Sequence, residues 1–497
     1  MDLAAVNSEP VDVLHLSLEE LTTLNMRRLK DYRVLERAGN SVLYRDKWRA
    51  EGIRSEKIET YEDLTRIPFI TSRELRKAID EEPIDKVLCT DSVVHWFCTN
   101  GTTGMPKWMP YGQRDVDLFL DIRDRAYSVL PSSAGVRSLT ITAPAPFVED
   151  AMSGFLMVRG MLTNTQGGGL QVCLTEKARD EAVEFALGLK PNVLCSFPSF
   201  AVRFAETVEE KAPEVARRRF SKDHSLRNLT KYLVTRVKKI RPKDLSRFRW
   251  GLFGGEPLDP YREVLRRAFD LEPYEIYLFT EFMCPAVECS MHDGMHLWMD
   301  ICIPEIIPES ELERERRNDT YVPKAVPLWK AKDGQKGEYV LTTFGDALPL
   351  VRYRFGDLME VISTERCRCG ITHPRIKVPR RCDSTICLGI TRFPASQLDE
   401  KLLAVTPYGK ARRWQLEVTR ERYHPKPIIR VEPSGKIEDT VSFLKEVSNR
   451  LRELEILRAG IENKVLAEPV VILEEKISDE GRLVTEKGRI IYEGDSR

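Results

Sequence analysis

The chain has 497 residues, in which 77 Lys and Arg side chains balance 77 Asp and Glu side chains. This zero net charge gives no electrostatic footprint for nucleic acid or for an anionic membrane. At ~100–200 residues per domain, the length predicts roughly two to four structural units. No apolar run approaches the ~18 residues that span a bilayer, and the first residues have neither the basic start nor the apolar stretch of a signal peptide. We therefore expect a cytoplasmic protein whose eleven cysteines are reduced, buried or metal-bound.

The predicted elements begin with helices, because apolar side chains recur at helical spacing between residues 13 and 70. From residue 93 to residue 353, short apolar runs of strand length alternate with helical stretches. Alternation of this kind favours a layered α/β core. Two polar stretches, residues 212–223 and 309–336, interrupt the pattern and are expected to be solvated. The clearest strands and helices are expected over residues 139–142, 193–195, 250–253, 179–189 and 260–269.

The pattern changes after residue 381. A helical stretch over residues 437–457, with Val441 on its apolar face and Gly460 at its C-cap, is set among three strand-like runs. The strand-like runs cover residues 414–418, 428–431 and 469–473. A unit of this size can fold as a domain of its own. The predicted fold is α/β, with a large multi-layer N-terminal domain over residues 1–382 and a small, mobile α+β C-terminal domain over residues 383–497.

A loop rich in threonine and glycine follows the apolar run at residues 93–97. Residues 99–107 read TNGTTGMPK. Glycines permit the backbone angles that turn successive N–H groups toward an anion, the hydroxyls of Thr102 and Thr103 add donors, and Lys107 adds a mobile positive charge. The loop is not a Walker motif, because Lys107 does not directly follow Gly104 and no Ser or Thr follows the lysine. The segment predicts a phosphate-binding loop.

Further motifs follow this loop in a fixed order. They read FGGEPL at 253–258, IYLFTE at 276–281, GEYVLTT at 337–343, LVRYRFGD at 350–357, and RCD at 381–383 with FP at 393–394. Together with TTGMPK at 102–107, the series resembles the adenylate-forming (acyl-CoA synthetase) superfamily. Three other segments resemble its phenylacetate-CoA ligase branch: SFPSF at 196–200, EC at 288–289 before GMHLW at 294–298, and THPRI at 372–376. The resemblance covers about residues 90–400.

The resemblance implies an AMP-forming carboxylate ligase. Such an enzyme uses ATP and Mg²⁺ to convert a carboxylic acid, here expected to be aromatic, into an acyl-adenylate, and then transfers the acyl group to CoA. The expected partners are therefore the small-molecule acid and CoA, and neither nucleic acid nor a membrane. A homodimer is a further hypothesis. The acid pocket is expected around Phe147, residues 196–200, Phe253, Gly254 and Phe279, where aromatic and small side chains could enclose a flat ring.

Residue roles also follow from the resemblance. Thr102, Thr103 and Gly104 would hold the β- and γ-phosphates. Glu281 would bind Mg²⁺, which bridges phosphate oxygens, and Lys107 is expected to be a catalytic cation.

The adenosine part of ATP is assigned to later motifs. Gly255, Glu256, Pro257 and Tyr277 would flank the adenine, and the carboxylate of Asp357 would accept both ribose hydroxyls. Thr280 and Arg381 complete the nucleotide-binding residues that the resemblance implies.

The sequence departs from the family pattern in three places. The tyrosine motif has Leu278 where the family has glycine. The hinge motif is reduced to RRCDS at residues 380–384, in which Asp383 is the expected hinge. Two segments match parts of the closing motif, and we assign its catalytic lysine to Lys487, with Arg482 as the alternative.

Cysteine and histidine spacing predicts a separate metal site. Cys367 and Cys369 form a close thiol pair, and the family topology implied by the resemblance would bring Cys289 and His296 nearby. Three thiolates and one imidazole suit a tetrahedral structural Zn²⁺. His373 is a reserve ligand. Free cysteines also act as small buried hydrophobic residues, so this apolar interpretation stands beside the zinc interpretation.

Two further hypotheses on function remain open. The enzyme could stop at the adenylate or pass it to a non-CoA acceptor, as relatives that adenylylate a deazaflavin cofactor do. Alternatively, the chain could be a nucleotide-binding regulatory protein that has lost turnover, because the hinge and closing motifs are the degraded ones. Exchange of ATP with pyrophosphate separates both enzymes from the regulatory protein, and CoA-dependent release of AMP separates the two enzymes from each other.

Overall fold

The computed structural model divides the chain into two compact units. The first unit comprises residues 1–98, 107–132 and 276–382, and the second comprises residues 99–106, 133–275 and 383–497. One limit between them falls at 382/383, where we predict the domain boundary, but the second unit also takes in residues 133–275. The predicted two-domain division therefore stays a prediction. The structure describes residues 12–98, 107–129, 137–142, 171–175, 179–237, 241–245, 247–282, 285–318, 320–381, 385–389, 391–403, 406–422, 424–477, 483–484 and 490–493.

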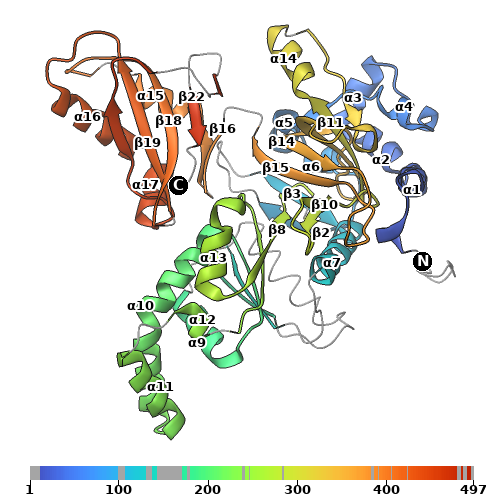
Figure 1. The fold of residues 1–497 in the computed structure, drawn as a ribbon. Coiled ribbons are helices and arrows are strands. Elements are labelled where there is room, and N and C mark those ends of the chain that lie inside the picture. Colours follow the sequence, from blue (N-terminus) through green and yellow to red (C-terminus); the bar gives the residue numbers. More distant parts are fainter. Residues whose placement is uncertain are drawn as a thin grey trace. The chain divides into compact units, whose positions relative to one another are not determined.

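The first unit opens with helices, as predicted, and Figure 1 draws them in blue. Their starts follow local capping chemistry: Ser17 and Thr71 each accept a hydrogen bond from the backbone N–H of a glutamate three residues later, and that glutamate bonds back to the cap. The helices are α1 (Leu18–Asp31), α2 (Val34–Asn40), α3 (Val42–Ala50), α4 (Tyr61–Leu64), α5 (Ser72–Glu81), α6 (Ile84–Val87), α7 (Gln113–Ser128) and α14 (Glu309–Arg317). Short 3-10 turns lie at Val13–His15, Ser55–Lys57 and Leu328–Lys330.

The sheet of the first unit is antiparallel along the order β12-β11-β13-β14-β15-β10-β9-β8, with the short β1 added to β14 in parallel. The apolar strand predicted near residue 93 forms a separate two-stranded ribbon, β2 with β3. The strands are β1 (Ile70–Thr71), β2 (Val93–Cys98), β3 (Trp108–Gly112), β8 (Glu272–Tyr277, of which residues 276–277 belong to this unit), β9 (Ala286–Glu288), β10 (Met295–Leu297), β11 (Cys302–Pro308), β12 (Val326–Pro327), β13 (Lys336–Thr343), β14 (Tyr353–Ser363) and β15 (Arg375–Arg381).

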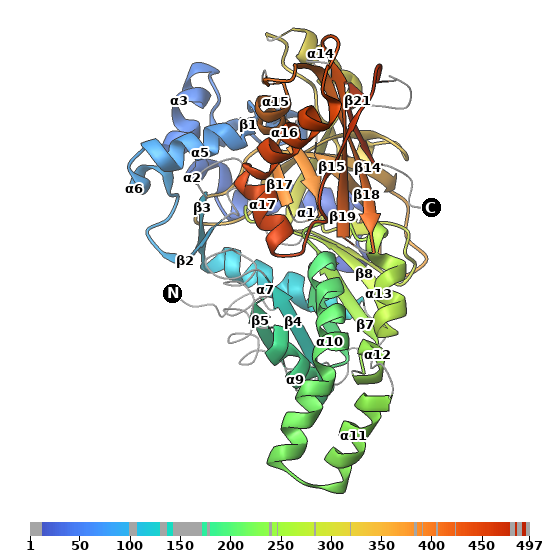
Figure 2. The same ribbon diagram turned by 90° about the vertical axis from the view of Figure 1, so that its left-hand side faces the viewer.

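The second unit contains a parallel sheet in the order β7-β6-β4-β5. Helices α9, α10 and α13 lie along it (Figure 2) and share an apolar core with its strands. The elements are β4 (Ser138–Thr142), β5 (Gln171–Thr175), α9 (Arg179–Leu189), β6 (Val193–Ser196), α10 (Pro198–Lys222), α11 (Leu226–Val237), α12 (Pro242–Leu245), β7 (Trp250–Gly254), a 3-10 turn at Asp259–Tyr261 and α13 (Arg262–Phe269). The predicted strands and helices of this region are confirmed. The solvated interruption expected at residues 212–223 is wrong, because residues 212–222 continue α10 and bury Ala212, Val215 and Ala216.

The C-terminal part of the second unit is a small α+β arrangement around the sheet β20-β19-β18-β22-β21. Trp414, Leu416 and Val431 pack with α16 in its core. Its elements are β16 (Thr385–Leu388), β17 (Thr391–Pro394), α15 (Ala395–Leu402), β18 (Ala411–Glu421), β19 (His424–Pro433), α16 (Thr440–Arg452), α17 (Glu455–Glu462), β20 (Val470–Leu473), β21 (Leu483–Val484) and β22 (Ile490–Glu493). The predicted α/β fold with a small α+β C-terminal part is confirmed.

Two details of the predicted C-terminal helix are wrong. The helix begins only after Asp439, whose carboxylate caps it, and the face it buries carries Phe443 and Val447, while Val441 is exposed. Gly460 is not a C-cap, because it lies inside α17. A Cβ at this position would come within 2.7 Å of Leu466 Cδ1, so close packing explains the glycine.

Candidate active site and metal centre

An ion pair joins two of the predicted motifs in the first unit. Nζ of Lys107 lies 2.5 Å from Oε1 of Glu281. The phenol of Tyr353 donates to the same carboxylate oxygen at 3.2 Å and accepts from the lysine at 3.3 Å. The lysine also donates to the hydroxyl of Ser72 at 3.3 Å. Because the Lys107 and Glu281 side chains are only 3% and 13% exposed, this polar cluster is shielded from bulk water.

Strand β3 fixes both sides of this cluster. Lys107 directly precedes the strand, and Tyr111 on the strand donates its hydroxyl to the carbonyl of Thr280 at 2.7 Å. The lysine and the loop that carries Glu281 are therefore held by the same five-residue strand. Tyr353 begins β14 and is aligned by β1, in which Ile70 is its register partner.

The charge of Lys107 sets the ionisation of Glu281. Burial acts to raise the pKa of the Glu281 carboxyl, but the neighbouring ammonium outweighs it and holds this pKa below its usual range. The carboxylate is therefore ionised at neutral pH, which is the form that a divalent cation requires.

The predicted adenine and ribose residues also meet. The hydroxyl of Tyr277, at the end of β8, donates to Oδ2 of Asp357 at 2.5 Å. Asp357 lies opposite Arg381 in the antiparallel register of β14 and β15. Three residues that the sequence assigns to nucleotide binding therefore lie on strands of one sheet, with Asp357 and Arg381 on the adjacent strands β14 and β15 and Tyr277 at the end of β8.

An aromatic cluster next to this pair was missed by sequence reasoning. Phe279 lies 4.1 Å from Phe355 between ring centroids, and Tyr339 stacks on Phe355 at 5.4 Å. Tyr277 contacts Phe279 at 5.1 Å. The motifs did contain a signal for this cluster, because Tyr353 and Phe355 lie two positions apart on one strand and their side chains therefore point to the same face.

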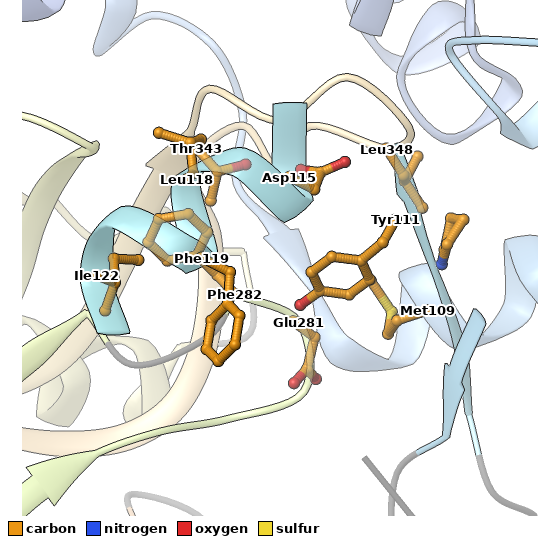
Figure 3. A pocket seen from close by; sticks show the side chains of 11 residues that line it. Met109, Tyr111, Asp115, Leu118, Phe119, Ile122, Glu281, Phe282, Thr343 and Leu348 are labelled. Atoms are coloured by element: carbon orange, nitrogen blue, oxygen red, sulfur yellow. The ribbon is translucent and has the colours of Figure 1, made fainter. Parts of the chain in front are cut away.

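A pocket lies beside Glu281 in the first unit (Figure 3). Its lining combines apolar and polar side chains: in the figure Leu118, Phe119 and Ile122 project from α7 toward it, while Met109 and Tyr111 come from β3. Its remaining lining residues are Pro110, Asp115, Glu281, Phe282, Thr343 and Leu348. The acid pocket predicted from the sequence uses other residues. Among these, Phe253 is fully buried in the core of the second unit, and Phe147 lies outside the described residues.

The motif containing Gly255, Glu256 and Pro257 belongs to the second unit. The carboxylate of Glu256 accepts from the backbone N–H of Ser199 at 2.7 Å and from the hydroxyl of Tyr261 at 3.2 Å. Burial raises the pKa of this carboxyl. Gly255 has φ +81°, and a Cβ there would lie 2.1 Å from the Phe197 ring, so the motif needs glycine at this position. Its assignment to adenine stays a prediction.

Several assigned residues cannot be placed. Thr102, Thr103 and Gly104 of the phosphate-binding loop, the hinge Asp383 and the closing-motif candidates Lys487 and Arg482 lie outside the described residues. Their roles stay predictions.

The four predicted zinc ligands come together in the first unit. One ligand atom from each of Cys289, His296, Cys367 and Cys369 lies within 4.8 Å of all the others. Sγ of Cys289 is 3.9 Å from Sγ of Cys367, and Sγ of Cys369 is 3.3 Å from Nε2 of His296. A tetrahedral Zn²⁺ with Zn–S bonds of ~2.3 Å places its sulfur ligands roughly 3.8 Å apart. The spacing therefore fits this ion.

Hydrogen bonds fix which nitrogen of His296 is available. Its Nδ1 lies 3.0 Å from the carbonyl oxygen of His373, which can only accept, so Nδ1 carries the proton. Nε2 then presents its lone pair toward Cys369, as in metal-bound histidines held by a second shell of hydrogen bonds. The predicted reserve ligand is wrong, because His373 uses both ring nitrogens elsewhere: Nδ1 accepts from Met299 N–H and Nε2 meets the carbonyl of Val13.

The pKa values of the four residues suit a metal ion that binds the neutral imidazole and displaces the protons of the thiols. Burial raises the pKa of the Cys289 thiol to about 12 and lowers the pKa of His296 to about 4, which keeps this ring neutral. Burial also raises the pKa of Cys369. At Cys367, burial is outweighed by hydrogen bonds led by the Cys369 N–H, and the pKa is lowered. Binding of a metal would release the protons of the less acidic thiols.

Comparisons with known proteins extend the resemblance over most of the chain. No family model matches it. The chain is 26% identical to a phenylacetate-coenzyme A ligase of Escherichia coli over 426 residues, which cover 84% of this chain and 83% of that protein. It is 25% identical over 458 residues to the phenylacetate-coenzyme A ligase of Thermus thermophilus, covering 89% and 87%. It is 24% identical over 498 residues to that of Aromatoleum evansii, covering 96% of each.

Solved structures share the fold at lower sequence identity. A 2-hydroxyisobutyryl-CoA ligase in complex with 2-HIB-AMP and CoA has a TM-score of 0.65 at 19% identity and matches 98% of this chain and 94% of that one. The acyl acid amido synthetase AtGH3.15 has a TM-score of 0.53 at 15% identity, covering 93% and 87%. Among the described residues no helix is both long and apolar enough to cross a membrane. With its ordered motifs and with distant relatives named phenylacetate-CoA ligase over most of its length, the chain belongs to the adenylate-forming ligase superfamily.

Proposed function

We propose that the protein is an AMP-forming acid–CoA ligase that activates an aromatic carboxylic acid. The observation that carries the proposal is the meeting of Lys107 and Glu281, 174 residues apart in sequence, in a shielded pair beside Tyr353. The pairing of Tyr277 with Asp357 supports it. The distant relatives named phenylacetate-coenzyme A ligase favour an arylacetic or aryl acid.

In the first half-reaction an oxygen of the substrate carboxylate attacks the α-phosphorus of ATP, and the bond from this phosphorus to pyrophosphate breaks. In the second, the sulfur of CoA attacks the acyl carbon, the thiol proton is lost to solvent, and AMP leaves with the electrons of the broken carbon–oxygen bond. Asp357 would hold the ribose hydroxyls through its second carboxylate oxygen while Tyr277 orients the first. Lys107 would place a positive charge where the polyphosphate is negative.

The residues present also fit Mg²⁺. Glu281 is ionised, partly shielded and already holds a cation, the Lys107 ammonium, on the oxygen that a metal would use. When Mg²⁺ is bound it neutralises phosphate charge. Arrival of ATP with its metal would free Lys107 for a phosphate oxygen.

We also propose that Cys289, His296, Cys367 and Cys369 bind one structural Zn²⁺. Four protein ligands fill a tetrahedron and leave no open position for catalysis. The loop at 367–373 is tied to the N-terminal turn, because Thr372 donates through its N–H and its hydroxyl to the carbonyl of Leu14. The metal would therefore stabilise the attachment of residues 12–16 to this loop.

The deciding experiment is a screen of carboxylic acids for AMP release, with and without CoA, combined with ATP–pyrophosphate exchange. We expect exchange with an aryl or arylacetic acid and CoA-dependent release of AMP. Exchange that is unaffected by CoA would support a non-CoA acceptor instead. ATP binding without exchange for any acid would support a nucleotide-binding regulatory protein.

A further inference from the structure

Helix α11 exposes an apolar seam in the second unit. Leu226 is 81% exposed, Leu233 is 52% exposed and Val237 is 90% exposed. With Thr230, which is also exposed, they follow the spacing i, i+4, i+7 and i+11. At 3.6 residues per turn, these positions fall within about 60° of the helix circumference. This set, Leu226, Thr230, Leu233 and Val237, is called the α11 seam below.

The helix is held in place by its opposite face. Helices α10 and α11 lie side by side in Figures 1 and 2, joined by a short turn in which Asp223 accepts from the backbone N–H of Ser225 and from the side chain of Asn228. The ring of Tyr232 stacks on Phe220 with centroids 6.0 Å apart and planes 3° apart. Because Tyr232 faces α10, the α11 seam is turned away from the contact that orders the helix.

The segment that carries the seam is strongly basic. Residues 211–243 contain twelve Lys and Arg but only two Asp and Glu, in a chain whose total charge is zero. Helix α11 itself contains three basic residues and no Asp or Glu, and its Arg236 is exposed. An apolar seam on a basic helix complements an apolar seam on an acidic helix.

We propose that the α11 seam is a docking site for an acidic amphipathic helix of a partner protein. A spacing of i, i+4, i+7 and i+11 is that of a helix–helix seam, in which side chains of one helix enter the gaps of the other.

Two other occupants fit less well. A second copy of the chain would bring two basic helices together, which like charges oppose. Helices that lie on membranes present a broad apolar face that carries Trp, Phe and Leu, whereas the α11 seam is narrow and purely aliphatic apart from Thr230. Among the exposed apolar side chains described on α11, Val234, 44% exposed, extends it on one side.

The test uses a synthetic 21-residue helical peptide with Leu at its a and d positions and Glu at its e and g positions, labelled with fluorescein. Its binding to the full chain is measured by fluorescence anisotropy at 50 mM and 300 mM NaCl. The test variant is the triple substitution Leu226→Ala, Leu233→Ala and Val237→Ala. The matched control is the double substitution Val322→Ala and Val441→Ala, which removes aliphatic side chains that are 70% and 78% exposed elsewhere.

We expect the triple substitution and the higher salt concentration each to weaken peptide binding at least tenfold. The control variant should bind the peptide like the unsubstituted protein. Melting temperatures within 2 °C of the unsubstituted protein would show that all variants are folded. Equal binding by the triple variant would overturn the proposal. So would co-sedimentation with phosphatidylglycerol vesicles without peptide binding, or seam-dependent dimers in analytical ultracentrifugation.

Discussion

The ammonium of Lys107 lies 2.5 Å from a carboxylate oxygen of Glu281, and Tyr353 bonds to both. The lysine closes the predicted phosphate-binding loop, and the glutamate closes the motif assigned to Mg²⁺. This ion pair therefore joins the predicted phosphate-binding loop to the predicted metal-binding motif.

Glu281→Gln should slow adenylation by at least tenfold at limiting Mg²⁺, because the amide keeps the shape of the side chain but lacks the charge. ATP–pyrophosphate exchange as a function of Mg²⁺ concentration measures the effect. Glu365→Gln, an exposed carboxylate of the same unit, is the control. Adenylation by Glu281→Gln at the unsubstituted rate would remove Glu281 from the site.

Asp357→Ala should weaken ATP binding about tenfold to hundredfold, since hydrogen bonds to a charged group contribute ~1.5–3 kcal/mol. Tyr277→Phe should produce a smaller loss, because it removes only the hydroxyl that orients Asp357. Calorimetric titration with ATP measures both affinities. An affinity of folded Asp357→Ala equal to that of the unsubstituted protein would contradict the ribose assignment.

The purified protein should contain about one Zn²⁺ per chain, and chelation should lower its melting temperature. Elemental analysis and thermal unfolding with and without chelator check this. Cys367→Ser should lose the metal, whereas Cys195→Ser, a half-buried cysteine outside the cluster, should keep it. Because zinc displaces thiol protons, the affinity should fall as the pH is lowered. Protein prepared without chelators that contains no metal would favour the apolar interpretation of the cysteines.

Stability should depend on pH through a half-buried carboxyl pair in the first unit. Burial, followed by the nearby charge of Asp346, raises the pKa of Asp115 to about 7. The folded state thus holds a proton that the unfolded chain releases near pH 3.9. This contribution is fully present below that pH and is lost as the pH rises through about 7.

Asp115→Asn should therefore be more stable than the unsubstituted protein at pH 8 by about 1 kcal/mol or more, since one pKa unit corresponds to about 1.4 kcal/mol. At pH 5 the difference should be smaller. Urea unfolding at both pH values tests this. Asp117→Asn, an exposed residue of the same helix, controls for the change of charge. A difference that does not depend on pH would contradict the assignment.

Lys487→Ala should slow adenylation, because it removes a few kcal/mol of transition-state stabilisation. A charge near the α-phosphate matters most as negative charge builds there. The CoA step should survive when the variant is given preformed acyl-adenylate. Equal impairment of both steps would argue against alternation of the C-terminal domain. Normal exchange in Lys487→Ala together with a loss in Arg482→Ala would move the closing motif to Arg482.

The sequence by itself determined the local features whose signals are short in range. Helix caps such as Ser17 require only a residue and its neighbour three positions on. The short apolar runs around Leu139 and Val193 were correctly predicted as strands, and their parallel pairing came from the structure. Ordered motifs were sufficient for the family. Even the Cys and His cluster could be anticipated, because a known topology links the two loops that carry it.

Only the tertiary structure decided which partner each polar side chain takes. The proton on Nδ1 of His296 depends on a carbonyl 77 residues away, and His373 is unavailable as a ligand because it meets Val13. The exposure of Val441 likewise depends on where its helix begins, which the cap residue Asp439 sets. The hydrogen bond between Tyr353 and Lys107 joins two segments that no local pattern connects. Hydrophobic periodicity fixes a face, but hydrogen-bond partners depend on how distant segments pack, and this information is absent from any short stretch of the chain.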